Sequence, residues 1–98
     1  SIKILTFALV CKKVTYIDID DDEQHVEEKI LFQSIFHKLN HDEISVQGEI
    51  NFTIPTDLPT SSQYIKDNEE IVWLISCNGK RRFLDIFCHD YRIYVMSQ

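Results

Sequence analysis

The stretch Gly48-Glu49-Ile50-Asn51-Phe52-Thr53-Ile54-Pro55-Thr56-Asp57-Leu58-Pro59-Thr60-Ser61-Ser62 says more about the fold than any other part of the sequence. Its apolar residues Ile50, Phe52 and Ile54 alternate with polar residues, and a period of two is typical of a strand with one buried face. Pro55 has no backbone N–H to donate, so it ends the predicted strand at Ile54. We therefore expect a half-buried strand followed by an extended, proline-containing connection.

A second apolar strand is predicted over Glu70–Cys77, around the only tryptophan of the chain, Trp73. Its side chain is large and apolar, so burial in the core is expected. Because the two predicted strands alternate in the same way, we expect Phe52, Ile54, Trp73 and Ile75 to share one core.

The pattern F-x-I-P-x-x-L-P-x-S over residues 52–61, followed by a strand centred on an aromatic residue, resembles the arrestin-like or immunoglobulin-like β-sandwich. It is especially similar to sandwich domains found between membrane segments of some bacterial proteins. The resemblance covers residues 48–95, and residues 2–36 more loosely. It implies an all-β, antiparallel β-sandwich of about seven strands. It also implies partner binding, because such sandwiches share no reaction.

The first third of the chain adds further strands to this prediction. Ile2–Lys12 is apolar at both odd and even positions, whereas Val14–Ile19 alternates. The two segments are expected to form either a hairpin or one long bent strand. His25–Leu39 fits helical spacing and strand alternation alike. We interpret it as a strand, which the resemblance favours, and a helix at 25–39 in an α+β subunit of a complex is the alternative.

The last third is expected to end in two short strands. Asn78-Gly79 predicts a turn after the tryptophan strand. Phe83–His89 and Tyr91–Val95 then alternate as strands do, with Asp90 as a break between them. With 98 residues, the chain is long enough for one domain, so residues 1–98 are interpreted as a single sandwich domain.

Composition and charge restrict the classes of partner. The formal net charge is −6 and the pI about 5.0, so phosphate groups of nucleic acids and of anionic lipids are repelled, and no nucleic-acid partner is expected. The one basic cluster, Lys80-Arg81-Arg82, is interpreted as a solvated hairpin tip, with a docking patch as the alternative. No apolar stretch reaches the roughly 20 residues needed to span a bilayer. The chain begins at Ser1, which suggests a domain excised from a longer protein.

An acidic segment at residues 18–23, with nearby histidines, is the candidate metal site. Carboxylates at alternate positions suit calcium, but the glycine of an EF-hand loop is missing, so a solvated acidic turn is expected. The spacing of His37 and His41 would align two ligands only on a helix. The residues considered were Asp18, Asp20, Asp21, Asp22, Glu23, His25, His37, His41 and His89.

Three cysteines, Cys11, Cys77 and Cys88, show no C-x-x-C spacing. They are expected to be small, buried hydrophobic residues, with one disulfide plus a free thiol, or a zinc site, as alternatives. Cys88 and His89 are neighbours, so on a strand their side chains lie on opposite faces and cannot form a dyad. No nucleophile elbow or phosphate loop is present, and Asn51 begins a short glycosylation pattern.

The sequence therefore predicts a non-enzymatic protein-interaction or structural module of a larger, membrane-anchored protein. No cofactor, catalytic residue or metal ligand is expected, and the resemblance favours an extracytoplasmic location. Exposed tyrosines are common interface anchors, and Tyr64 and Tyr94 are predicted to be exposed. The competing hypotheses are a metal-binding or enzymatic domain that uses the acidic 18–23 segment, and the α+β subunit described above.

Overall fold

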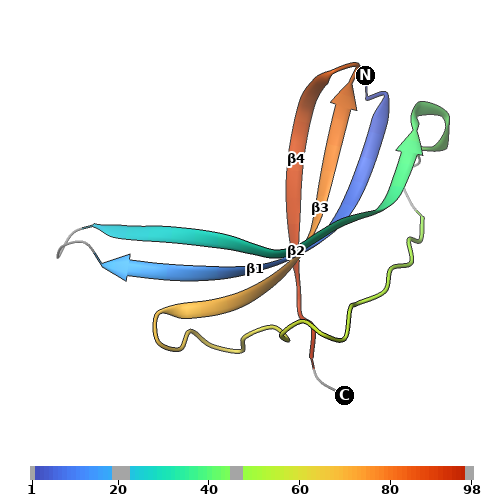
Figure 1. The fold of residues 1–98 in the computed structure, drawn as a ribbon. Helices are drawn as coiled ribbons and strands as arrows, with labels where there is room; N and C mark the ends of the chain where they lie inside the picture. The colour runs from blue at the N-terminus through green and yellow to red at the C-terminus, as the bar shows by residue number, and fades with distance from the viewer. Residues whose placement is uncertain (1, 19–22, 45–47, 97–98) are drawn as a thin grey trace.

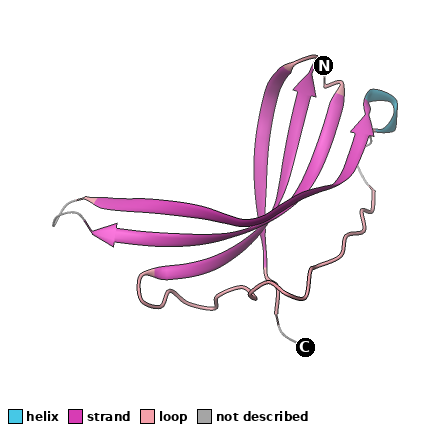
Figure 2. Ribbon diagram, in the orientation of Figure 1, coloured by secondary structure: helices cyan, strands magenta, loops and turns pink. Residues whose placement is uncertain are grey.

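The computed structural model describes residues 2–18, 23–44 and 48–96. Within these ranges, four antiparallel strands form one sheet in the order β2-β1-β3-β4 (Figures 1 and 2). The all-β, antiparallel prediction is confirmed, whereas the described residues form four strands in a single sheet and no second sheet. The elements are β1 (Ile4–Asp18), β2 (Gln24–Asn40), a 3-10 turn η1 (His41–Glu43), β3 (Glu69–Arg81) and β4 (Leu84–Ile93).

The described chain is extended compared with a compact domain. Its radius of gyration is 16.2 Å, against about 13 Å for a compact chain of this length. The two hairpins of long strands and the bend of the sheet, visible in Figure 1, account for the difference. No helix among the described residues is long and apolar enough to cross a membrane.

β1 is one continuous strand, so the hairpin between Ile2–Lys12 and Val14–Ile19 was wrong and the long-strand alternative is confirmed as far as Asp18. Lys12 and Lys13 lie within the strand, and the Lys12 ammonium contacts the Glu28 carboxylate on β2 at 2.9 Å. β1 lies between β2 and β3, and its buried residues belong to apolar clusters on both faces of the sheet. Its apolar residues therefore occur on both parities.

β2 is a strand, as predicted, and the helix at 25–39 was wrong. Two irregularities in its register with β1 leave Leu31 and Phe36 as extra residues on β2. Each such bulge shifts the alternation by one residue, so apolar side chains occur at neighbouring positions and resemble the spacing of a helix. Bulges also bend a strand and increase its twist, which fits the bent sheet in Figure 1.

The turn between β3 and β4 lies at Arg82 and Phe83, so the turn predicted at Asn78-Gly79 was wrong. Arg82 takes the left-handed backbone conformation, with φ of 59°, and the Phe83 side chain at the tip is fully exposed, at 100%. The cluster Lys80-Arg81-Arg82 thus ends β3 and enters the turn, which agrees with its interpretation as a hairpin tip.

Gly79 lies inside β3 because the Phe87 ring of β4 occupies the space above its backbone. A Cβ atom at position 79 would lie 2.3 Å from Cε1 of Phe87. β4 also continues through Asp90, so the two short strands predicted on either side of it are one strand as far as Ile93. Ile86 is the extra residue of a bulge, since Gly79 pairs with Phe87 and Lys80 with Asp85.

Two apolar clusters lie on the two faces of the sheet. Leu9, Cys11 and Trp73 form the centre of one face, which we call the covered face. The second face carries a separate cluster. Its buried members are Ala8, Val10, Val14, Val72 and Leu74.

Residues 48–68, called here the crossing segment, run along the covered face between η1 and β3 (Figure 1). The strand predicted at Gly48–Ile54 was wrong, because these residues have no strand partner. Their alternation instead reflects packing on the sheet: Ile54 and Leu58 contact the covered-face cluster, and the Phe52 ring lies 5.0 Å from that of Phe36. The predicted core of Trp73 with Ile54 and Ile75 is confirmed, while Phe52 packs at its margin.

Candidate functional site

Trp73 holds the crossing segment on the covered face. Its side chain is 0% exposed, and its indole Nε1–H donates a hydrogen bond of 2.9 Å to the backbone carbonyl of Pro59. Pro59 follows the turn at Thr56 and Asp57, so this bond fixes the place where the segment passes over β3. The bond also satisfies a buried polar group that would otherwise carry a cost.

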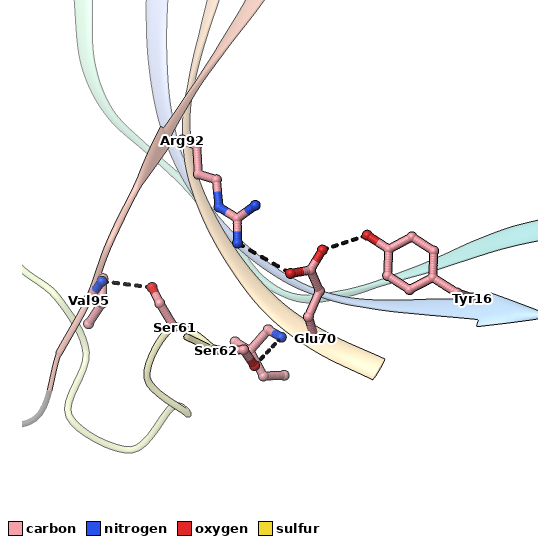
Figure 3. Close-up of polar contacts among 7 residues, drawn as sticks. Tyr16, Ser61, Ser62, Glu70, Arg92 and Val95 are labelled. Carbon is pink, nitrogen blue, oxygen red and sulfur yellow. Dashed lines mark hydrogen bonds and ion pairs between the residues drawn. The ribbon is translucent and has the colours of Figure 1, made fainter. Parts of the chain in front are cut away.

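Ser61 and Ser62 attach the same segment to two other parts of the chain (Figure 3). Ser61 donates its backbone N–H to the Val95 carbonyl at 2.8 Å, and its Oγ accepts the Val95 N–H at 2.7 Å. Ser62 makes the equivalent pair with Ile71, at 3.0 and 2.8 Å. Each serine thus hydrogen-bonds to both the N–H and the carbonyl of one residue. Through Ser61, the residues after β4 are joined to the crossing segment.

An open, mainly apolar pocket of about 670 Å³ lies between these two joined segments. Residues 93–96 form one wall. The crossing segment forms the other wall through Phe52, Ile54, Pro55, Thr56, Leu58 and Thr60. The hydrogen bonds of Ser61 and Trp73 lie beside this wall and hold it in place.

The side chains that line the pocket carry apolar groups and hydroxyls. Its lining residues supply no carboxylate, amine, imidazole or thiol, so no general acid–base pair or metal ligand set is formed by them. The polar groups at hand are hydroxyls, those of Thr56, Thr60 and Tyr94. The Tyr94 ring also receives the Arg92 guanidinium at 5.2 Å from its centroid, which restrains one wall.

A polar network at the end of β3 connects three strands near this site. Glu70 of β3 accepts a hydrogen bond of 2.5 Å from the Tyr16 hydroxyl of β1 and one of 3.3 Å from Arg92 of β4 (Figure 3). The hydrogen bond to Glu70 is the main cause that raises the pKa of Tyr16 above its ordinary value, and desolvation adds to it. The neutral phenol is therefore the form that the folded chain stabilises.

We expect Tyr16→Phe to lower the free energy of unfolding by about 1 kcal/mol at pH 7, since one side-chain hydrogen bond is lost. Because the folded-state pKa of Tyr16 is raised, its contribution is fully present below the unfolded pKa of about 10 and is lost as the pH rises through the folded value. Urea unfolding of both proteins between pH 7 and 11 measures the difference. A difference that stays constant over this range would contradict the assignment.

The residues of the predicted metal site are not brought together in the described part of the chain. Asp18 ends β1, while Asp20, Asp21 and Asp22 lie outside the described residues. His25 lies near Glu27 at 3.8 Å, and His41 near Asp42 at 3.4 Å, both exposed. His37 is on β2 and His89 on β4, and no group of three or more possible metal ligands occurs among the described residues.

The three cysteines are free thiols in different surroundings. Cys11 and Cys77 are buried, as predicted, and burial raises the pKa of both thiols. The burial predicted for Cys88 was wrong, because this residue is exposed on the edge strand β4, where its Sγ lies 3.5 Å from the Ser76 hydroxyl. The disulfide alternative is therefore not formed here.

The pocket itself was missed by the sequence interpretation, although the exposure predicted for Tyr64 and Tyr94 is confirmed. Its two walls are more than thirty positions apart in the sequence, and no local pattern joins Thr56 to Met96. The one sequence feature that could have pointed to the pocket was the Ser61-Ser62 pair, at the end of the stretch Gly48–Ser62.

Comparisons with known proteins give no relative for this chain. No protein-family model matches it, no curated protein matches its sequence, and no solved structure matches its fold.

Proposed function

We propose that this chain is a non-enzymatic protein-binding module, and that the pocket between residues 52–60 and 93–96 receives apolar side chains of a protein partner. The observation that carries the proposal is the pocket itself, about 670 Å³ in volume, lined by apolar side chains and hydroxyls. That volume falls in the range of about 300–1,000 Å³ that is common for ligand sites.

The kind of residue at the pocket supports a protein partner. Phe52, Tyr94 and Met96 belong to the residue types that are enriched where proteins meet, and all three are exposed at this site. The Ser61–Val95 and Trp73–Pro59 hydrogen bonds fix both walls before a partner arrives. A pre-formed pocket lowers the entropy cost of binding.

Membrane anchoring and the arrestin-like sandwich are the other parts of this proposal. Their support is the resemblance of residues 48–95 to sandwich domains of membrane-anchored bacterial proteins. In that context the module would act from an extracytoplasmic position on a partner close to the membrane, where anchoring raises the effective concentration. The metal-binding alternative stays a prediction, because most of its acidic segment lies outside the described residues.

Selection from a library of random linear peptides displayed on phage tests the binding proposal. We expect the enriched peptides to share an apolar residue, and Thr56→Arg to weaken their binding about tenfold or more by placing a charged side chain in the pocket. Thr53→Arg is the matched control, because Thr53 is exposed on the same segment but does not line the pocket. A selection without enrichment, or equal binding by Thr56→Arg and the original chain, would refute the proposal.

A further inference from the structure

β4 is an edge strand whose outer backbone groups have no strand partner among the described residues. Its side chains are exposed from Leu84, at 74%, through Tyr91. An exposed strand of ten residues with many apolar side chains is a template for pairing with another strand.

The other edge, β2, is better protected against such pairing. It carries Lys29 and Lys38, the acidic pair Glu27-Glu28, and two bulges, all of which are features that hinder edge-to-edge contact. β4 carries Asp85, Asp90 and Arg92, but it has no lysine or proline between Leu84 and Ile93 and only a single bulge, at Ile86. β4 is therefore the edge with fewer obstacles to pairing.

We propose that β4 pairs antiparallel with β4 of a second copy of this chain, about a two-fold axis that passes through His89. In a sheet, directly opposite residues lie on the same face, so a two-fold pairing joins residues of equal parity on either side of the axis. In the pairing centred on His89, Cys88 lies opposite Asp90 of the second copy. Phe87 lies opposite Tyr91 of the second copy.

The bulge at Ile86 makes the charges complementary in this register. On β3, Asp85 is paired with Lys80, and Arg92 is paired with Leu74. Lys80 and Leu74 are an even number of residues apart on β3, so they lie on the same face of the sheet. Their partners Asp85 and Arg92 therefore lie on that face too. Beyond the bulge, Asp85 then lies opposite Arg92 of the second copy. The two-fold axis repeats this contact, giving two oppositely charged pairs, each of a kind that stabilises paired strands.

Both charged groups are accessible for this contact. The Asp85 side chain is 66% exposed and its distance to the Lys80 ammonium is 3.8 Å, while Arg92 is 39% exposed. Two further kinds of pair are apolar: Phe87 with Tyr91 of the second copy, and Leu84 with Ile93 of the second copy. Aromatic cross-strand pairs of this kind also stabilise a sheet.

Neighbouring registers are less favourable. A pairing centred on Asp90 would place two Asp90 carboxylates opposite each other, and like charges in that position are destabilising. A pairing centred on Tyr91 would leave Asp85 without a partner within β4. It would also extend into residues 94–96, where Val95 is already bonded to Ser61. The register at His89 uses the whole of β4, from Leu84 to Ile93.

Disulfide trapping tests the register. Cys77 is paired with His89 on β3 and would capture a new thiol at position 89, so it is replaced together with Cys88. His89→Cys, in a Cys77→Ala, Cys88→Ser background, places the thiols of the two copies opposite each other at about 4.5–5.5 Å between Cα atoms, within disulfide range. Tyr91→Cys in the same background is the matched control, because its two copies would be about 13 Å apart. With oxidised glutathione, we expect a covalent dimer for His89→Cys and little for Tyr91→Cys. Equal cross-linking of the two, or none of His89→Cys, would overturn the proposal.

Charge reversal provides a second test that does not depend on a new cysteine. In sedimentation experiments, Asp85→Arg and Arg92→Asp are each expected to raise the dimer dissociation constant about tenfold. The double variant should dimerise more tightly than either single variant, because the charge pair between the copies is formed again, whereas the pairs Arg92–Glu70 and Asp85–Lys80 within each copy stay broken. Asp90→Arg is the control, with little effect expected. A purely monomeric original chain, or a double variant weaker than both single ones, would refute the pairing.

Discussion

Trp73→Ala is expected to lower the free energy of unfolding by about 3–5 kcal/mol, as for other large-to-small core substitutions. The side chain is fully buried at the centre of the covered face, against Leu9 and Cys11, with Ile54 and Leu58 packed over it. Its removal leaves a cavity and also leaves the Pro59 carbonyl without its donor. Urea unfolding of the two proteins measures the difference.

A second variant separates the packing of Trp73 from its hydrogen bond. Trp73→Phe keeps an aromatic ring in the core but has no N–H for Pro59, so we expect a smaller loss than for alanine. A loss below about 1 kcal/mol for Trp73→Ala would show that Trp73 does not belong to the core.

Leu9→Ala is expected to cost about 2–5 kcal/mol of unfolding free energy. Leu9 lies in the central strand β1, is 2% exposed, and belongs to the same cluster as Trp73. Leu84→Ala is the matched control on the edge strand β4. Because Leu84 is largely exposed, its change should stay within about 0.5 kcal/mol.

Urea unfolding of the two leucine variants provides the comparison. The same slope of unfolding free energy against urea concentration is used for both variants. The dimer proposed above would add a contribution at Leu84, so the measurement is made at a protein concentration where the chain is monomeric. Equal losses for Leu9→Ala and Leu84→Ala would contradict the location of the core on the covered face.

Local alternation was sufficient to predict an antiparallel all-β chain, but not to count its strands. Lys12-Lys13 suggested a break, yet Lys12 continues the strand, because it is paired with Ile30 of β2 and Val72 of β3, and its ammonium contacts Glu28. Asn78-Gly79 suggested a turn, yet Gly79 continues β3 because its missing side chain makes room for the Phe87 ring. In both cases a contact with a neighbouring strand, invisible in a single window of sequence, outweighed the local preference.

The crossing segment shows that alternation can also predict a strand where none is formed. Residues 48–54 alternate as a strand does, but Ile54 packs on a sheet face instead of extending a ladder. Alternation reports which side chains face an apolar surface, and it does not report which backbone groups are paired. The pocket was beyond prediction for a related reason, since its walls meet through the bonds between Ser61 and Val95.

Both the core and the proposed binding pocket depend on the crossing segment being fixed on the covered face of the sheet. Hydrogen exchange of the Trp73 indole N–H, followed by NMR, tests this most directly, because that proton is donated to Pro59 of the segment. We predict that it exchanges slowly. The amide protons of Ile71 and Val95, which are donated to the hydroxyl oxygens of Ser62 and Ser61, should exchange slowly as well. Exchange of all three protons at the rate of an unstructured chain, while the β1 amides and the other β3 amides remain protected, would contradict the account.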